Sequence, residues 1–349
     1  VVEQGTVTEI FKHASHPYTK ALVAAAPDVE QPRTPGLRFS TIDTRAIFGE
    51  AEFGDAAART VSAEVKPATE PLGNDGVPAL EICDVHRHFR IGGGMLPFRR
   101  KELRAVNGVS LRIQPGTTTA LIGESGSGKS TLGRCVAHLD SPTSGKILHN
   151  GVDVGSLKGE ALLDFRRQVQ TIFQDPFASL NPRRRIGEAI TDGLAIHGLA
   201  NAEERRRVAR DLLVRVGLDP DQDRRFPHQF SGGQRQRIAI ARALALDPDF
   251  MVADEAVSAL DVSVRAQILN LLSDIQQERG LTFLFITHDL STVRQFADRV
   301  AIMRAGEIIE EGETEEVFTR PRHDYTRGLL DAVPRVHLET ARRLRPLPA

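Results

Sequence analysis

A glycine-rich stretch has the composition of a phosphate-binding loop. Gly123–Ser130 matches the pattern G-x-x-x-x-G-K-[ST] and directly follows the apolar run Thr118–Ile122. Glycines at this spacing let backbone N–H groups turn towards phosphate oxygens, and the start of the next helix adds its positive end. Lys129 is expected to reach the outer phosphates, and Ser130 to bind Mg²⁺. The expected phosphate contacts are Gly123, Ser125, Gly126, Ser127, Gly128, Lys129, Ser130 and Thr131.

Two adjacent carboxylates follow a second apolar run, Phe250–Ala253. Acids at the carboxyl end of a buried parallel strand face the crevice in which ligands bind. Asp254 is therefore expected to hold Mg²⁺, directly or through water, and Glu255 to orient and polarise the attacking water. Taken alone, an apolar strand that ends in two acids is common. The phosphate loop upstream favours a functional interpretation of this pair.

A further anion site is expected where Ser231, Gly232 and Gly233 open a helix. A helix that begins with Ser and two Gly presents free backbone N–H groups to a negative charge. Because no lysine accompanies them, these residues would serve as an added clamp on a nucleotide rather than as a second nucleotide pocket. An ordinary Ser N-cap is the alternative interpretation of the same residues.

The elements that must position these residues alternate along the chain. Short apolar runs predict buried strands, and the stretches between them carry helical periodicity. Such alternation predicts a mostly parallel sheet covered by helices on both faces. The expected strands are Leu80–Phe89, Val106–Ile113, Thr118–Ile122, Lys146–Leu148, Val169–Phe173, Phe250–Ala253, Thr282–Thr287, and a hairpin of Val300–Arg304 with Glu307–Ile309. The expected helices are Lys129–Leu139, Ile186–Leu199, Ala202–Val216, 232–246, 262–279, Thr314–Phe318 and Tyr325–Ala332.

The composition of the chain excludes several classes of protein. The 349 residues carry 45 basic and 46 acidic side chains, a formal net charge of −1, which argues against a general nucleic-acid binder. No apolar run approaches the roughly 18 residues that cross a bilayer. The two cysteines, Cys83 and Cys135, lie far apart in sequence, which excludes a disulfide framework and favours a reducing compartment.

The chain also repeats itself near its two ends. At an offset of 307 positions, residues 2–29 fall on residues 309–336, and many pairs are identical. The identical pairs include Glu3 with Glu310, Gly5 with Gly312, His16 with His323, Tyr18 with Tyr325, Thr19 with Thr326, and Pro27 with Pro334. Val1 thus corresponds to a position late in a domain, and we expect the chain to be cut from a longer polypeptide. A coincidence between two short helical tails is the alternative explanation.

Taken together, the motifs resemble those of the nucleotide-binding subunits of ATP-binding cassette (ABC) transporters. The resemblance covers about residues 79–336 and rests on six motifs in the order of that family. In this sequence the motifs are Gly123–Ser130 as Walker A, Gln174 as the Q-loop, Ser231–Gln234 as the signature, Phe250–Glu255 as Walker B, Ser258–Asp261 as the D-loop and His288 as the switch histidine. Two residues depart from the family pattern: Phe230 replaces Leu before the signature, and Ala256 replaces Pro after the catalytic acid.

The resemblance implies a role for each matched residue. Gln174 would contact Mg²⁺ or the water and sense the γ-phosphate, and His288 would hydrogen-bond the γ-phosphate and Glu255. Phe89 would stack on adenine, although His88 competes because the Gly92–Gly94 insertion makes this position the least certain. The implied catalytic residues are Lys129, Gln174, Glu255 and His288, and the implied Mg²⁺ ligands are Ser130, Gln174 and Asp254. The residues implied to contact or shape the site of a partner domain are Ser231, Gly232, Gly233, Gln234 and Asp261.

The same resemblance implies a fold and a division of the chain. The fold would be an α/β P-loop NTPase of the ABC ATPase type, with a mostly parallel core sheet, an antiparallel β subdomain and an α-helical subdomain. Residues 1–29 would be the C-terminal tail of a preceding ABC ATPase domain, and 30–78, rich in Pro, Ala, Thr and Glu, a flexible linker. Residues 79–336 would form the nucleotide-binding domain, and 337–349 a C-terminal tail.

Three further segments resemble the oligopeptide/dipeptide/nickel importer branch. They are Phe173–Arg183, Pro227–Phe230 and His323–Arg327. With the repeat, they suggest a fused protein with two cassettes, as in some peptide and glutathione importers. This branch often carries a cysteine cluster for an iron–sulfur centre near its C-terminus, but no cysteine follows Cys135 here.

The implied function is that of an ATP-binding and ATP-hydrolysing subunit that powers import of peptides or related small solutes. The implied cofactors are ATP and Mg²⁺. Its partners would be a second ABC ATPase domain, two transmembrane permease subunits and an extracytoplasmic solute-binding protein, with no nucleic acid. It would lie peripherally on the cytoplasmic face of the inner membrane. The alternatives are a soluble ABC ATPase of translation or DNA repair, and an exporter ATPase, and the transported solute is not encoded in these motifs.

Overall fold

The structure, a computed structural model, describes residues 1–6, 9–10, 13–25, 39, 76–91, 101–258 and 260–333. Most of the expected linker over 30–78, the Gly92–Gly94 insertion and the expected tail over 337–349 lie outside these residues. Within the described residues, no helix combines the length and the apolar character that a membrane crossing requires.

The core sheet has six strands in the order β10-β9-β3-β8-β7-β6. Neighbours from β9 to β6 run parallel, and β10 closes the edge as an antiparallel hairpin with β9. The bounds are β3 Thr118–Ile122, β6 Val169–Ile172, β7 Phe250–Asp254, β8 Thr282–Thr287, β9 Arg299–Arg304 and β10 Glu307–Glu313. The predicted mostly parallel sheet is therefore confirmed.

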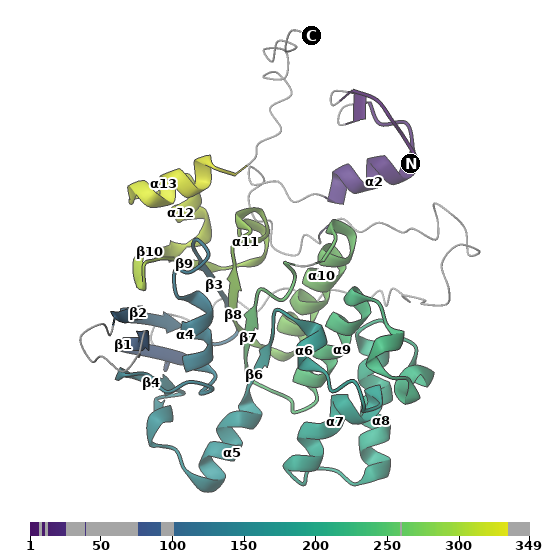
Figure 1. Cartoon of the computed structure of the whole chain (residues 1–349), viewed down its shortest axis with the longest axis horizontal. Helices are drawn as coiled ribbons and strands as arrows, with labels where there is room; N and C mark the ends of the chain where they lie inside the picture. The colour runs from purple at the N-terminus through teal and green to yellow at the C-terminus, as the bar shows by residue number, and fades with distance from the viewer. Residues whose placement is uncertain are drawn as a thin grey trace.

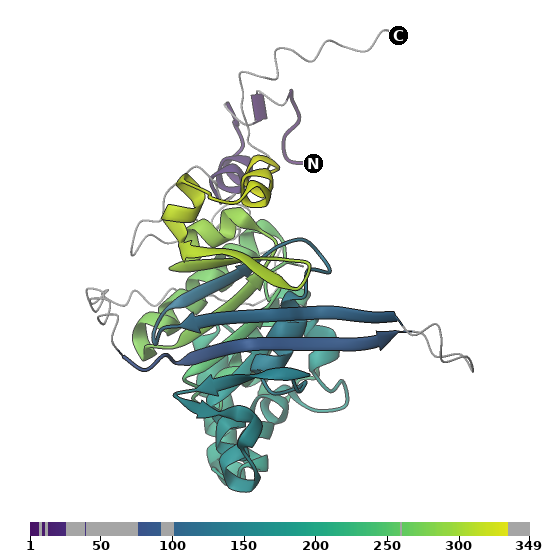
Figure 2. The same cartoon turned by 90° about the vertical axis from the view of Figure 1, so that its left-hand side faces the viewer.

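A second sheet is wholly antiparallel, in the order β2-β1-β4-β5. Its bounds are β1 Leu80–Ile91, β2 Lys101–Ile113, β4 Ser144–His149 and β5 Val152–Asp153. Figure 2 shows the two long strands β1 and β2 lying side by side across one face of the molecule. This sheet is the antiparallel β subdomain that the family resemblance implies.

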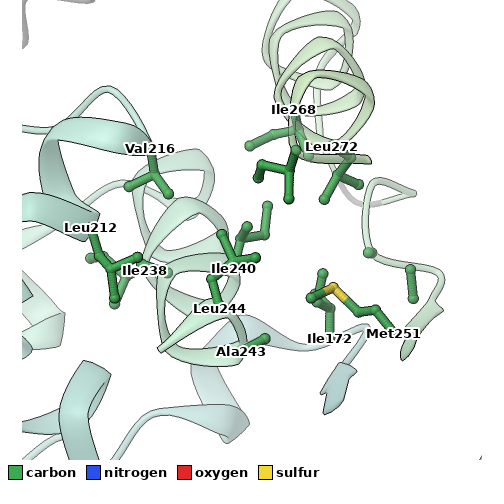
Figure 3. Close-up of a cluster of buried hydrophobic side chains, with 14 of the residues drawn as sticks. Ile172, Leu212, Val216, Ile238, Ile240, Ala243, Leu244, Met251, Ile268 and Leu272 are labelled. Atoms are coloured by element: carbon green, nitrogen blue, oxygen red, sulfur yellow. The ribbon is translucent and has the colours of Figure 1, made fainter. Parts of the chain in front are cut away.

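The strands β7 and β8 are buried on both faces, which is why their sequences are almost continuously apolar. Side chains alternate across a strand, so the two strands feed two different cores. Met251, Ala253, Phe283 and Phe285 belong to a core that they share with several helices. Figure 3 shows Met251 in this core. Phe250, Val252, Leu284 and Ile286 face the antiparallel sheet across helix α4 (Lys129–Val136).

Helices form a third part of the domain on the side away from the antiparallel sheet (Figure 1). Their bounds are α6 Pro176–Ser179, α7 Ile186–Ile196, α8 Ala202–Arg215, α9 Gly232–Leu244 and α10 Val262–Arg279. Helix α8 begins with a capping box: the Asn201 side chain accepts from the Glu204 N–H, and Glu204 accepts from the Asn201 N–H. Buried apolar faces of α7 to α10 meet in one core, which gives the expected α-helical subdomain.

The expected elements are largely confirmed, but several were not predicted, among them the short helix α6 and the two-residue strand β5. Helix α5 (Gly159–Gln168) was not predicted because only Phe165 of it is buried, so its apolar periodicity is weak. Helix α11 (Leu290–Phe296) was not predicted because it is short, and its start depends on the Asp289 side chain that accepts from two backbone N–H groups. Several predicted helices extend too far: the one predicted to reach Leu139 ends at Val136.

The described parts of the two repeated segments share a set of hydrogen bonds around one carboxylate and a helix that follows them. In the first, the Glu3 carboxylate accepts from Ser15 N at 2.6 Å and His16 N at 3.2 Å, and helix α2 (Pro17–Ala25) follows. In the second, the Glu310 carboxylate accepts from Arg322 N at 2.7 Å and His323 N at 3.1 Å, before helix α13 (Asp324–Asp331). Helix α12 (Thr314–Thr319) lies between Glu310 and α13. The repeat thus extends to side-chain hydrogen bonds.

Candidate nucleotide site

The phosphate loop lies between β3 and α4, as predicted, and Lys129 is folded onto it. Lys129 Nζ donates to the carbonyls of Gly123 at 2.8 Å and Glu124 at 2.7 Å, and the residue is 4% exposed. The first N–H groups of a helix have no partner within the helix, so the start of α4 offers donors to an anion. Ser130 and Thr131 belong to this first turn.

Three glycines let the loop lie against its neighbours. A Cβ at Gly128, where φ is +107°, would stand 2.0 Å from the carbonyl oxygen of Ala105 in β2. A Cβ at Gly123 would stand 2.1 Å from the carbonyl oxygen of Met303 in β9. Gly306 completes the contact, because its N–H donates to the Ser127 carbonyl at 2.9 Å. The loop is therefore held by backbone from both sheets.

The electrostatics of the loop favour an anion beside Lys129. Burial lowers the pKa of Lys129, while the charges of Glu255, Asp254 and Glu124 raise it and offset part of that effect. A buried ammonium ion whose hydrogen bonds go only to neutral oxygens gains from a phosphate group placed next to it.

Two oxygen donors expected to hold Mg²⁺ face each other. Ser130 Oγ donates to Asp254 Oδ1 at 2.9 Å. Burial raises the pKa of Asp254, the Ser130 hydrogen bond lowers it, and the charge of Glu255 raises it further. Among the described residues, no group of three or more His, Cys, Asp or Glu could hold a metal by itself. A hydroxyl and a destabilised carboxylate suit a hard cation that takes its remaining ligands from phosphate and water.

Glu255 connects the other two expected catalytic residues. Gln174 Nε2 donates to Glu255 Oε2 at 2.7 Å, and His288 Nδ1 lies 3.2 Å from Glu255 Oε1. Each carboxylate oxygen therefore has its own partner, and the three side chains come from the ends of β6, β7 and β8. Which nitrogen of His288 carries the proton depends on the tautomer.

The backbone at Glu255 is unusual for a residue with a side chain. Its φ is +45°, in the left-handed region, and its N–H donates to the Ile286 carbonyl at 2.9 Å. Ser258 Oγ donates to the Glu255 carbonyl at 2.9 Å. These bonds hold a conformation that a non-glycine residue rarely adopts, and they turn the carboxylate off the strand towards Gln174 and His288.

Phe89 and His88 lie on opposite faces of β1. The Arg87 guanidinium lies over the Phe89 ring, 4.7 Å from its centroid, whereas the His88 ring contacts His86 at 5.7 Å and Glu102 at 3.3 Å. Arg87 is close enough to α4 for its charge to lower the pKa of Cys135, although burial dominates and raises that pKa to about 11. Phe89 therefore shares the face of β1 that is turned towards α4.

The signature and D-loop residues occupy helix starts. The Ser231 side chain accepts from Gln234 N at 3.3 Å, and Gln234 Oε1 accepts from Ser231 N at 2.9 Å, so these residues form a capping box at α9. Asp261 caps α10 by accepting from Val264 N at 2.9 Å. Among the described hydrogen bonds of this chain, none joins Ser231–Gln234 to the phosphate loop. The structure thus brings together the loop, Asp254, Glu255, Gln174 and His288, but not the signature.

Two residues near the site were not predicted from the sequence to contact it. Tyr325 accepts, through its hydroxyl oxygen, a hydrogen bond from Glu124 N at 3.3 Å, so α13 reaches the phosphate loop. Arg265 on α10 contacts Asp289, the neighbour of His288, at 2.9 Å. Only the three-dimensional fold reveals these contacts, because a single Arg or Tyr on a helix otherwise resembles an ordinary surface residue.

Sequence comparisons match both the domain and its ends. The sequence profile described as "ABC transporter" matches residues 106–258, and "Oligopeptide/dipeptide transporter, C-terminal region" matches residues 2–49 and 309–348. The chain is 44% identical over 333 residues to the glutathione import ATP-binding protein GsiA of Escherichia coli, and 44% identical over 337 residues to that of Salmonella typhi. Each alignment covers 95% of this chain and 52% of the relative, so the chain spans about half the length of these curated relatives.

Solved structures give the same assignment. The dimeric post-hydrolysis state of the ATP-binding cassette MJ0796, bound to ADP and Pi, matches with a TM-score of 0.60 and 31% identity, over 67% of this chain and 98% of that one. The structure of cbiO1 from Clostridium perfringens, part of the ABC transporter complex cbiONQ, matches with a TM-score of 0.60 and 27% identity, over 75% and 98%. The alternative of translation or DNA repair is not favoured. The chain therefore belongs to the ATP-binding proteins of ABC transporters, in the branch with the oligopeptide/dipeptide transporter C-terminal region.

Proposed function

We propose that this chain binds and hydrolyses ATP to power an ABC importer of peptides or related small solutes. The observation that carries the proposal is the placement of Lys129, the Ser130–Asp254 pair and the Gln174–Glu255–His288 cluster at the carboxyl ends of parallel strands. This is where ligands bind in an open α/β sheet, and each residue type suits one part of a triphosphate, its cation and a water.

The residues divide the work of hydrolysis. Lys129 and the first turn of α4 bind the outer phosphates, and Glu255 accepts the proton of the attacking water while Gln174 and His288 hold its carboxylate in place. Ser130, Asp254 and Gln174 would hold Mg²⁺, which neutralises charge on the phosphates when bound. Phe89, on the face of β1 turned towards α4, supplies the ring that stacks on adenine in preference to His88.

The complete site needs a second ATPase domain. Ser231–Gln234 and Asp261 cap helices, and no described hydrogen bond joins them to the phosphate loop, so we assign them to an ATP held by a partner domain. The shared hydrogen bonds of Glu3 and Glu310 support a tandem arrangement, in which residues 1–29 end one ATPase domain and 79–336 form the next. Two ATP molecules would close the two domains together, and hydrolysis would release them.

The remaining partners follow from the branch. Two transmembrane permease subunits and an extracytoplasmic solute-binding protein would complete the importer, with this chain bound peripherally on the cytoplasmic side of the inner membrane. GsiA is named for glutathione import, and we propose a peptide-like solute for the importer that this chain powers. The sequence profile at residues 2–49 and 309–348 supports this branch over an exporter ATPase.

The proposal is tested by purifying the full-length native protein from its membrane and measuring peptide-dependent ATP hydrolysis in proteoliposomes. We expect two multi-span membrane proteins to co-purify, and hydrolysis to rise when the solute-binding protein and its peptide are added. A matched preparation with Lys129→Ala should assemble but hydrolyse no ATP. Co-purification of ribosomes or DNA in place of membrane proteins, or full hydrolysis with Lys129→Ala, would overturn the proposal.

A further inference from the structure

Phe39 contacts helix α10, although the two residues that meet are 231 positions apart in the chain. Phe39 N donates to Asn270 Oδ1 at 2.9 Å, and Asn270 Nδ2 donates to the Phe39 carbonyl at 2.9 Å. One side-chain amide thus satisfies both backbone polar groups of one residue, as a neighbouring β-strand would do. The two hydrogen bonds of Asn270 therefore recognise the main chain at position 39 and do not depend on the side chain there.

The side chain of Phe39 adds an apolar contact beside this amide. It is half-buried and packs against the core formed by α7 to α10 with β7 and β8. Asn270 itself is half-buried on α10, so water competes less for its two hydrogen bonds than at an exposed site. Two polar contacts and one aromatic anchor therefore meet at one point of the helix.

A second part of the same region contacts the same helix. Helix α2 lies against α10, as Figure 1 shows near the upper end of that helix. The profile of the oligopeptide/dipeptide transporter C-terminal region matches residues 2–49, a range that contains both α2 and Phe39. The first copy of that region thus contacts α10 at two places that are separated in sequence.

We infer that α10 carries a docking site for this first copy, with Asn270 as the receptor for the main chain at Phe39. The occupant is α2 together with Phe39 of this same chain. Because Asp261 of the D-loop caps α10, the docked residues are fixed to the helix that follows the D-loop. If the proposed tandem arrangement holds, this docking also joins the preceding ATPase domain to this one. The docking itself does not depend on the tandem arrangement.

Mild chymotrypsin digestion of the chain tests the docking, with cleavage after Phe48 as an internal reference for cleavage after Phe39. Asn270→Leu keeps the branching at Cγ but removes both hydrogen bonds, so we expect the ratio of the two cleavages to rise about ten-fold. Asn270→Asp, which keeps only the acceptor, should give an intermediate ratio. Gln277→Ala on the exposed face of α10 is the matched control and should leave the ratio unchanged.

A second variant tests the docking without any substitution in α10, so misfolding of that helix cannot explain its result. Phe39→Ala leaves the helix intact, and tryptic cleavage after Arg38 should rise several-fold while the thermal unfolding midpoint stays near that of the wild type. Equal ratios in wild type, Asn270→Leu and Gln277→Ala would overturn the docking site. Protection that weakens on hundred-fold dilution would show that a second copy supplies Phe39, which also contradicts the proposal. Neither assay uses ATP, so loss of the proposed hydrolysis would not alter the result.

Discussion

Arg265 joins the D-loop to the residue after the switch histidine. Its Nη1 lies 2.9 Å from Asp289 Oδ2, and its Nη2 donates to the Leu260 carbonyl at 3.1 Å. Asp289 in turn accepts from Ser291 N at 3.1 Å at the start of α11. One guanidinium therefore sets the position of the D-loop relative to the segment that carries His288.

Replacing Arg265 should affect both stability and turnover. Arg265→Gln removes a charged hydrogen bond between two largely buried groups, so we expect a loss of about 2 kcal/mol in the free energy of unfolding. We also expect kcat for ATP to fall several-fold with little change in KM, because no contact of Arg265 is to a phosphate-loop residue. Arg279→Gln, whose partner Asp247 is exposed, is the control and should cost less than about 1 kcal/mol. An unchanged kcat in Arg265→Gln would contradict the coupling.

Asp289 should make stability depend on acid pH. Burial opposes its ionisation, but hydrogen bonds from Ser291 and Thr292 and the charge of Arg265 outweigh burial, so its pKa lies below the usual 3.8. A carboxylate with a lowered pKa stabilises the fold above its unfolded pKa, and this contribution is lost as pH falls through the folded value. Between pH 7 and pH 3, chemical unfolding should therefore show a smaller loss of stability in Asp289→Asn than in wild type. Parallel pH curves for the two proteins would contradict this role.

Glu255→Gln should separate binding from turnover. The amide keeps the size of the side chain and a partner for Gln174 and His288, but it cannot accept the proton of water. In the assembled transporter we expect ATP hydrolysis to fall about 100-fold or more, with ATP affinity retained. Glu124→Gln, an exposed acid of the phosphate loop, is the control and should retain most of the activity. Hydrolysis at the wild-type rate in Glu255→Gln would rule out the assigned role.

Asp254→Asn should have opposite effects on the free and the nucleotide-bound protein. Burial raises the pKa of Asp254, so its protonated carboxyl group contributes stability below the unfolded pKa, and that contribution is lost as pH rises through the folded pKa. At pH 7 the neutral amide should leave the thermal midpoint of the free protein equal to the wild type or higher. ATP with EDTA should raise the midpoint similarly in both proteins, and Mg²⁺ should add a further rise in wild type but not in Asp254→Asn. A lower midpoint of the free variant would contradict this assignment.

The two repeated carboxylates should differ in their contribution to stability. Glu310 is 8% exposed, and its carboxylate accepts from two backbone N–H groups and from Thr326 Oγ1 at 2.5 Å. Glu310→Gln keeps the shape but weakens these charged hydrogen bonds, so we expect a loss of about 2 kcal/mol in the free energy of unfolding. Glu3 has its pKa lowered to about 2 by hydrogen bonds from Thr19 and Ser15, yet it is less buried. Glu3→Gln should therefore leave the main unfolding transition in place, and an equal loss in both variants would contradict the difference in burial.

Much of the fold could be predicted from local sequence, because its buried strands and amphipathic helices carry strong patterns. The strand Thr282–Thr287 and the helix 262–279 have their predicted bounds. Helix α5 lacked such a pattern, because only one of its residues is buried. The phosphate loop was predicted as a unit because its motif lies within one continuous segment, Gly123–Ser130.

The rest of the site depends on which strand ends meet in space. Gln174 and Glu255 are 81 positions apart, and their hydrogen bond follows from β6 lying next to β7, which no local pattern states. Arg265 and Phe39 were not singled out for a similar reason. Their partners, Asp289 and Asn270, become neighbours only after α10 has packed.

The close approach of Gly128 to Ala105 has a consequence for what the site can measure. Because the loop touches β2 through backbone atoms, the antiparallel sheet and the phosphate loop can shift only together. Phe89 lies on β1, which pairs with β2, so we expect the proposed adenine-stacking ring to keep a nearly constant distance from the phosphate loop. A ligand that contacts both is selected by its length as well as by its charge. Any larger side chain at Gly128 would change the distance between the ring and the loop.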